Sequence, residues 1–209
     1  MMKKTLLIAF LFPICTLKAQ IKERSAISGF NIAADVHVLG WASTYFQYLD
    51  KNSPTGFGGG FRIGYGINEM FEPYAEFNAT SLSTADIDAQ SFTMTHFDAG
   101  LRINLAGNVH PVRPFIEGGY TYLRGSAKQV INGNDHVDLV FYGGKPHVGG
   151  GLRYFFKIPM SVFARGIFTV GKKSNATLDG TEISDKPDVT TFRISAGFNL
   201  NLTKLSKSK

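Results

Sequence analysis

Strict alternation between apolar and polar residues is the feature that most constrains how this chain folds. It is clearest near the C-terminus, where residues 189–202 have one apolar and one polar face. The apolar positions are Phe192, Ile194, Ala196, Phe198, Leu200 and Leu202, and the positions between them are Thr191, Arg193, Ser195, Gly197 and Asn199. Because successive side chains of a β-strand point to opposite faces, this spacing predicts a strand with two different surfaces.

The same pattern returns along the chain and predicts eight strands. They are residues 30–38, 57–67, 71–82, 92–105, 112–125, 139–154, 160–170 and 189–202. Short connections at 68–70, 106–111 and 156–159 alternate with long ones at 40–56, 83–91, 126–138 and 171–188. This rhythm predicts an all-β, eight-stranded antiparallel up-and-down β-barrel with both chain ends on the side of the short turns. Pro146 cannot donate to a ladder and predicts a bulge or a later start of the sixth strand.

The polar faces of these strands carry many charges, whereas the apolar faces are broad and continuous. The charged positions expected to point inward are Asp35, Arg62, Glu72, Glu76, Asp98, Arg102, Arg113, Glu117, Lys145, Arg153, Arg165 and Arg193. A soluble barrel of the lipocalin type would instead have an apolar interior and a polar outside. The broad apolar face favours a transmembrane barrel, which faces lipid outside and holds polar groups inside.

Residues 1–19 have the pattern of a secretory signal peptide. Lys3 and Lys4 precede an apolar run, and the small residue Ala19 precedes the expected cut. The run is shorter than the roughly 20 residues that a membrane-spanning helix needs. The predicted organisation is therefore a signal peptide at 1–19, a barrel domain at 20–203 and a polar tail at 204–209.

Removal of the signal peptide changes the net charge and the cysteine content of the chain. It takes away three lysines and no acid, so the formal charge falls from +6 to +3. Much of the basicity therefore belongs to the signal, and no nucleic-acid partner is expected. Removal also takes away Cys15, the one cysteine, so disulfides and thiolate metal sites are not expected.

The last predicted strand resembles the assembly signal of small outer-membrane β-barrels, the OmpA-like transmembrane domains and their short relatives. The signal combines a polar residue, a glycine and two apolar residues, matched here by Ser195, Gly197, Leu200 and Leu202. The chain departs from the pattern by continuing through residues 203–209. The resemblance spans residues 28–202. It implies a Gram-negative cell envelope, insertion into the outer membrane by the barrel-assembly machinery, and periplasmic termini.

The inward charges are the first place to look for function. An eight-stranded barrel is only wide enough inside for side chains, so these groups are expected to pair and plug the lumen. This predicts a structural or surface-interaction role exercised through loops 40–56, 126–138 and 171–188. The alternative is a minor ion or proton conductor. A wide pore is excluded because porins need about 16 strands or more.

A lipid-A-modifying hydrolase is the enzymatic alternative. Such an enzyme needs a serine, a histidine and an acid together at the rim. His96 is followed on its own face by Asp98 and His147 by Gly149, so the strands offer no such set and no enzyme is predicted. Scattered histidines without a recognised spacing predict no metal, and no cofactor is expected. The expected partners are outer-membrane lipids, lipopolysaccharide and unnamed surface partners, with the protein as a monomer.

Four aromatic residues follow the first predicted strand. They are Trp41, Tyr45, Phe46 and Tyr48. Because Trp and Tyr suit the level of lipid headgroups, we interpret them as an aromatic belt at the outer interface. An exposed binding patch is the alternative interpretation.

Overall fold

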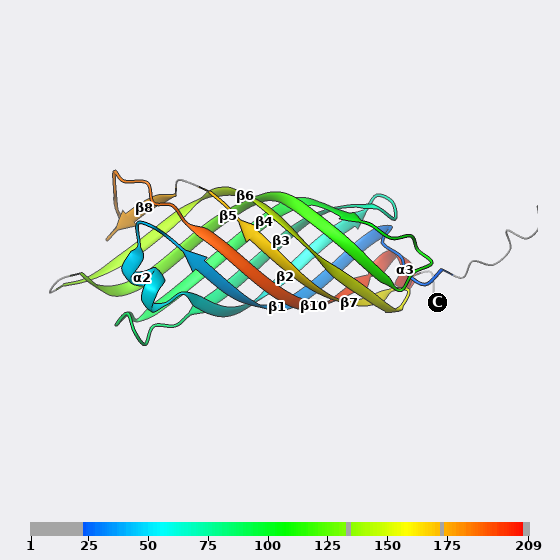
Figure 1. Cartoon of the computed structure of the whole chain (residues 1–209), viewed down its shortest axis with the longest axis horizontal. Coiled ribbons are helices and arrows are strands. Elements are labelled where there is room, and N and C mark those ends of the chain that lie inside the picture. The colour runs from blue at the N-terminus through cyan, green and yellow to red at the C-terminus, as the bar shows by residue number, and fades with distance from the viewer. Residues whose placement is uncertain (1–22, 133–134, 172–173, 207–209) are drawn as a thin grey trace, which may run out of the picture.

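The computed structural model describes residues 23–132, 135–171 and 174–206, so the predicted signal peptide lies outside the described residues. The chain forms an elongated closed barrel (Figure 1). Its eight strands are β1 (Gly29–Ala42), β2 (Thr55–Gly66), β3 (Phe71–Leu82), β4 (Ser91–Asn104), β5 (Val112–Asn132), β6 (Asp135–Lys157), β7 (Met160–Thr169) and β10 (Thr190–Asn201). All neighbours pair antiparallel, and β5–β6 pairing closes the sheet. The predicted fold class is confirmed.

The two ends of the barrel differ in their connections (Figure 1). One, here called the loop end, carries helix α2 (Gln47–Asn52) and the short strands β8 (Asn175–Leu178) and β9 (Thr181–Glu182). The other, the turn end, carries the short turns and helix α3 (Leu202–Ser206). Lys204 Nζ lies 3.5 Å from Glu23 Oε1, so the first described residue meets helix α3 at the turn end. No helix in the described part of the chain is long and apolar enough to span a membrane.

The largest difference from the sequence prediction is at the loop end. The predicted loop 126–138 is mostly strand, because β5 and β6 continue to pair beyond a register shift between Ala127 and Val130. The expected bulge or late start at Pro146 is wrong. The β6–β7 ladder ends at His147 and the β6–β8 ladder begins at Tyr142, so Pro146 lies where β6 lacks a ladder partner on one side. The missing N–H therefore costs no ladder hydrogen bond there.

The outer face of the barrel is apolar along its length. Outward residues such as Val36, Phe61 and Ile194 are 55%, 52% and 58% exposed. Alternate residues on the same strands, among them Asp35, Arg62 and Arg193, are buried inside. Exposed apolar area on this scale is unusual for a soluble monomer and matches a lipid-facing wall.

The interior is layered along the barrel axis. Asn31 and Ala33 are the inward residues of β1 nearest the turn end, and Asp35, His37, Leu39 and Trp41 follow toward the loop end. Charged residues therefore give way to histidine and then to apolar side chains. The last layer is a buried cluster that we call the apolar cap: Leu39, Trp41, Phe46, Leu49, Leu82, Ile87, Phe92, Met94, Leu123, Ala127, Val130, Leu139, Phe141, Ala176 and Val189.

Trp41 and Phe46 belong to this cap, so the interpretation of both as an outer aromatic belt is wrong. Trp41 is 5% exposed, and its ring stacks on Phe141 with centroids 5.8 Å apart. Its indole N–H donates to the carbonyl oxygen of Ser53 at 2.7 Å, which satisfies the one polar group of the side chain. β1 extends to Ala42, and Trp41 is at an inward position of it. Tyr45 and Tyr48 are exposed at the loop end.

The turn end is closed by the chain segment that precedes β1. Ser25, Ala26 and Ile27 are fully buried in the mouth of the barrel. The amides of Ile27 and Ser28 donate to the two carboxylate oxygens of Glu69, at 3.0 and 3.2 Å. These bonds fasten the segment to the turn between β2 and β3.

Candidate functional site

Eight of the twelve predicted inward charges form one connected set of ion pairs. This central network contains Asp35, Arg62, Glu72, Glu76, Arg102, Glu117, Arg153 and Arg165. Four acids face four arginines, so its formal charge is zero. Seven of the eight barrel strands contribute a member, and only β10 does not. The network therefore ties opposite walls of the barrel together.

Glu117 on β5 is one centre of the network. Arg62 Nη1 donates to Glu117 Oε2 at 2.9 Å, and Arg102 Nη2 donates to the same oxygen at 2.8 Å. An aromatic ring also covers each of these guanidinium groups. Arg62 lies 3.9 Å from the centroid of the Tyr74 ring, and Arg102 lies at the same distance from that of Phe115. Ion pairs and ring faces together replace the water that these cations lose.

Arg165 on β7 is the second centre. It donates to Asp35 Oδ2 at 2.8 Å and to both carboxylate oxygens of Glu76. Its Nη1 also lies 3.4 Å from Glu117 Oε1, which joins the two centres. Arg153 extends the network toward the turn end through Glu72, at 3.2 Å. Each carboxylate thus has at least one arginine partner.

The remaining four predicted charges lie outside the central network. Arg193 pairs with Asp98 across the barrel. Arg113 pairs at 2.8 Å with Glu69, a residue of the β2–β3 turn that strand alternation could not assign to a face. Lys145 Nζ donates to the Gly171 carbonyl oxygen at 3.2 Å and has no acid partner among the described residues. All twelve side chains are nevertheless buried.

Three histidines lie between the central network and the apolar cap, each beside a hydroxyl group. His37 Nε2 lies 2.8 Å from Thr80 Oγ1, and His96 Nε2 lies 3.4 Å from Thr191 Oγ1. His147 contacts two hydroxyls. Its Nε2 lies 2.7 Å from the Tyr74 hydroxyl and its Nδ1 2.8 Å from Thr121 Oγ1.

Thr121 in turn donates to Asp98 Oδ1 at 2.7 Å, so hydrogen bonds connect Tyr74, His147, Thr121 and Asp98. This series of hydrogen bonds ends on the turn-end side of the apolar cap. Within the described part of the chain, no serine hydroxyl is hydrogen-bonded to a histidine ring, and no cluster of three or more metal-ligating side chains is present. The histidines, hydroxyls and Asp98 thus form a buried polar layer.

The predicted assembly-signal residues lie on β10 and at the start of α3. Ser195 points inward and is buried, and Leu202 begins α3. Gly197 faces the interior beside Phe163. A Cβ at this glycine would come 2.6 Å from Phe163 Cζ, so only glycine leaves room for that ring.

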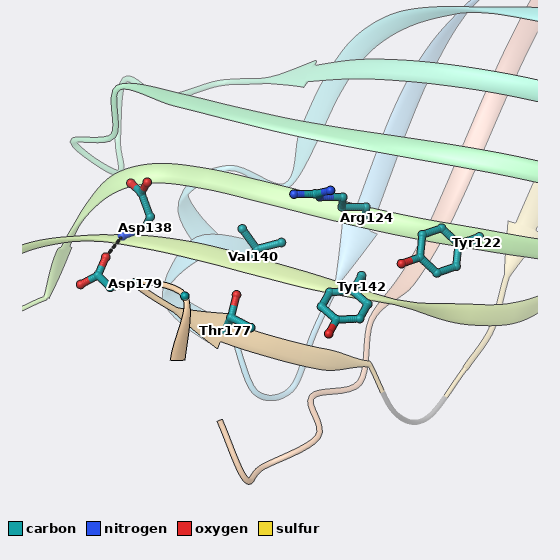
Figure 2. A pocket seen from close by; sticks show the side chains of 8 residues that line it. Tyr122, Arg124, Asp138, Val140, Tyr142, Thr177 and Asp179 are labelled. Carbon is teal, nitrogen blue, oxygen red and sulfur yellow. Dashed lines mark hydrogen bonds between the residues drawn. The ribbon is translucent and has the colours of Figure 1, made fainter. Parts of the chain in front are cut away.

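A second candidate site lies on the outer wall of the loop end (Figure 2). It is an open groove of about 650 Å³ over β5, β6 and β8. Its lining residues are Tyr122, Arg124, Asp138, Val140, Tyr142, Thr177, Asp179 and Gly180. Strand alternation did not reveal this groove, since the fifth strand was predicted to end at residue 125 and β8 was not predicted.

The loops of this end are held to each other by hydrogen bonds. The amide and the hydroxyl of Thr44 both donate to Asp188 Oδ1, at 3.0 and 2.7 Å. Burial opposes ionisation of Asp188, but these hydrogen bonds outweigh it and hold the pKa of the carboxyl below its usual range. The contact joins the loop after β1 to the one before β10, and so closes the rim where the first and last strands meet.

Comparison with known proteins places the fold. No protein-family model matches the sequence, and no curated protein sequence matches it. The crystal structure of Neisserial surface protein A (NspA) is similar with a TM-score of 0.62 and 18% identity, over 84% of this chain and 98% of that one. The outer membrane protein OprG from Pseudomonas aeruginosa is similar with a TM-score of 0.59 and 9% identity, over 86% and 98%. Ail, the attachment invasion locus protein of Yersinia pestis, follows with a TM-score of 0.51 and 12% identity, over 83% and 99%.

Proposed function

We propose that this chain, which has the fold of the small outer-membrane β-barrels, is an integral outer-membrane protein with a plugged lumen. In this proposal it acts as a structural or surface-interaction protein through its loop end, which faces outside the cell. The observation that carries the proposal is the apolar cap, because it lies across the lumen on the loop-end side of every charged layer. If the lumen conducts nothing, the protein can act only through its outer surfaces.

Strand length supports the assignment of the loop end to the extracellular side. A tilted membrane strand needs about 9–11 residues. β5 and β6 have 21 and 23 residues. Both strands therefore project well beyond the bilayer, and Figure 1 shows them extending past their neighbours at the loop end. Long extracellular extensions and short periplasmic turns are the usual asymmetry of such barrels.

The proposal also covers the environment of the protein. The apolar outer wall fits outer-membrane lipids and lipopolysaccharide, and the β10 residues Ser195, Gly197 and Leu200 with Leu202 fit recognition by a barrel-assembly machinery. We propose a monomer, with termini in the periplasm. The loops at 40–56 and 171–188 and the β5–β6 hairpin form the surface available to extracellular partners.

A bilayer measurement tests the plugged lumen. We expect the folded protein in planar lipid bilayers to give no conductance steps above the protein-free baseline. The reason is that ions would have to cross the uncharged, water-excluding cap. A 16-stranded porin in the same bilayers is the positive control. Reproducible single-channel steps that depend on the folded form would contradict the plugged lumen and favour the conductor alternative.

A further inference from the structure

We propose that the groove on the outer wall of the loop end binds the phosphorylated saccharide headgroup of an outer-leaflet lipid of the lipid A type. The inference rests on the proposed function, since it requires the loop end to lie at the outer leaflet. It adds a site and a ligand chemistry to that function. The argument begins with the charge inside the groove.

Arg124 is the cation of the groove. Its side chain is exposed, and among the described residues its guanidinium group has neither an ion pair nor a hydrogen-bond partner. The next outward residues of β5 toward the turn end are Tyr122 and Tyr120, which are 50% and 58% exposed. Arg124 is thus the first charge above the apolar wall on this strand. Arginine at that level suits a phosphate group, which its planar fork can bind through two parallel hydrogen bonds.

Two tyrosines flank this arginine. Tyr142 of β6 lies directly opposite Arg124 in the strand register, and Tyr122 precedes Arg124 on β5. Figure 2 shows both rings on the same side of the sheet as Arg124. Tyrosine has an apolar ring and a polar hydroxyl, which suits the boundary between acyl chains and headgroups. These rings would contact the base of a lipid headgroup.

Polar acceptors occupy the other end of the groove. Asp138 and Asp179 lie beyond Val140, away from the two tyrosines (Figure 2). The amide of Asp138 donates to Asp179 Oδ1 at 2.7 Å, and the amide of Gln129 donates to Asp138 Oδ1 at 2.9 Å. Among the described residues, the Oδ2 atom of each carboxylate accepts no hydrogen bond, so it can accept one from a saccharide hydroxyl.

The order along the groove therefore gives the ligand a direction. Tyr122 lies nearest the membrane, Arg124 and Tyr142 lie opposite each other at the next level, and the acids lie farthest out. Acyl chains would run along the apolar wall, a phosphate would meet Arg124, and the sugar would extend toward the carboxylates. A free phosphate could contact only Arg124, whereas a lipid headgroup could also contact the tyrosines and the carboxylates, so a lipid headgroup is the ligand that uses the whole groove.

Native mass spectrometry of the folded full-length mature protein tests this proposal. Diphosphorylated lipid A and lipid A without phosphates are added in parallel, and the bound fraction is measured. We expect the wild type to bind the phosphorylated form, and Arg124→Gln to weaken its binding about tenfold, the loss typical of one charge-assisted hydrogen-bonding group. Lys157→Gln is the matched control, since it removes one exposed cation at the turn end and should leave binding unchanged.

Three results would overturn the inference. They are equal binding by wild type and Arg124→Gln, equal binding of dephosphorylated lipid A, and full competition by equimolar inorganic phosphate, which would indicate a free-anion site. Heat-modifiable gel mobility, recorded for each variant, separates this outcome from failure of the proposed function. Absence of lipid A binding by the wild type, with the folded barrel retained in the outer membrane, counts against the groove alone. A wild-type chain that is absent from the outer membrane counts against the proposed function.

Discussion

Arg165→Met is expected to lower the free energy of unfolding by about 3–5 kcal/mol, the usual cost of removing one partner from a buried ion pair. Arg165 holds Asp35, Glu76 and Glu117 across the lumen. Methionine fills a similar volume but leaves buried carboxylates short of a cation. Urea unfolding in detergent micelles, followed by the fluorescence of the single tryptophan, Trp41, measures the loss.

Lys145→Met is the matched control for this prediction. It also removes one buried cation, but Lys145 has no acid partner among the described residues, so no carboxylate is stranded. We expect a change of at most about 1 kcal/mol, the net value of a single hydrogen bond. Addition of Glu76→Gln to Arg165→Met should recover part of the loss, because contacting residues are not additive. Equal stability of Arg165→Met and wild type would mean that the central network does not hold the barrel closed.

Phe141→Ala is expected to cost about 3–5 kcal/mol, as large-to-small substitutions of buried aromatics do. Phe141 is fully buried in the apolar cap, where it contacts the rings of Trp41, Phe46 and Phe92. Its removal leaves a cavity against Trp41. Besides the lower urea midpoint, quenching of Trp41 fluorescence by acrylamide should therefore increase.

Tyr142→Ala is the neighbouring control, because Tyr142 is on the opposite face of the same strand and outside the cap. It should change stability by less than about 1 kcal/mol, as surface substitutions usually do. Phe141→Leu should fall between the two, since it keeps most of the apolar volume. If Phe141→Ala and Tyr142→Ala were equally mild, the cap would not be a packed core.

Alternation along the chain was sufficient to predict the strand number, the antiparallel order and the interior faces. In a membrane barrel the inward positions are polar and the outward positions are apolar. The face on which a residue such as Arg62 or Ile194 lies can therefore be predicted from its position in the alternation. The same rule would have placed Trp41 inside, since it is six residues from Asp35 on the same strand. The error arose because the first strand was predicted to end at Val38, whereas β1 continues to Ala42.

Other parts of the site could not be predicted from alternation. Arg165 and Glu76 are 89 residues apart and meet across the lumen, and that pairing depends on the tilt and stagger of the strands. Glu69 is in a turn, where the period of two no longer applies. The outer groove needs β8 beside β6, and β8 is a strand of four residues with little pattern of its own.

Antibody labelling of intact cells tests the central claim most directly, namely a membrane-embedded barrel with its loop end outside. One epitope is inserted at Gly180, in the turn between β8 and β9, and another is fused after Lys209. The account predicts that the first is labelled on intact cells and that the second is labelled only after the outer membrane is permeabilised. Labelling of the Lys209 epitope on intact cells, with the Gly180 epitope hidden, would contradict the orientation and the functional surface together.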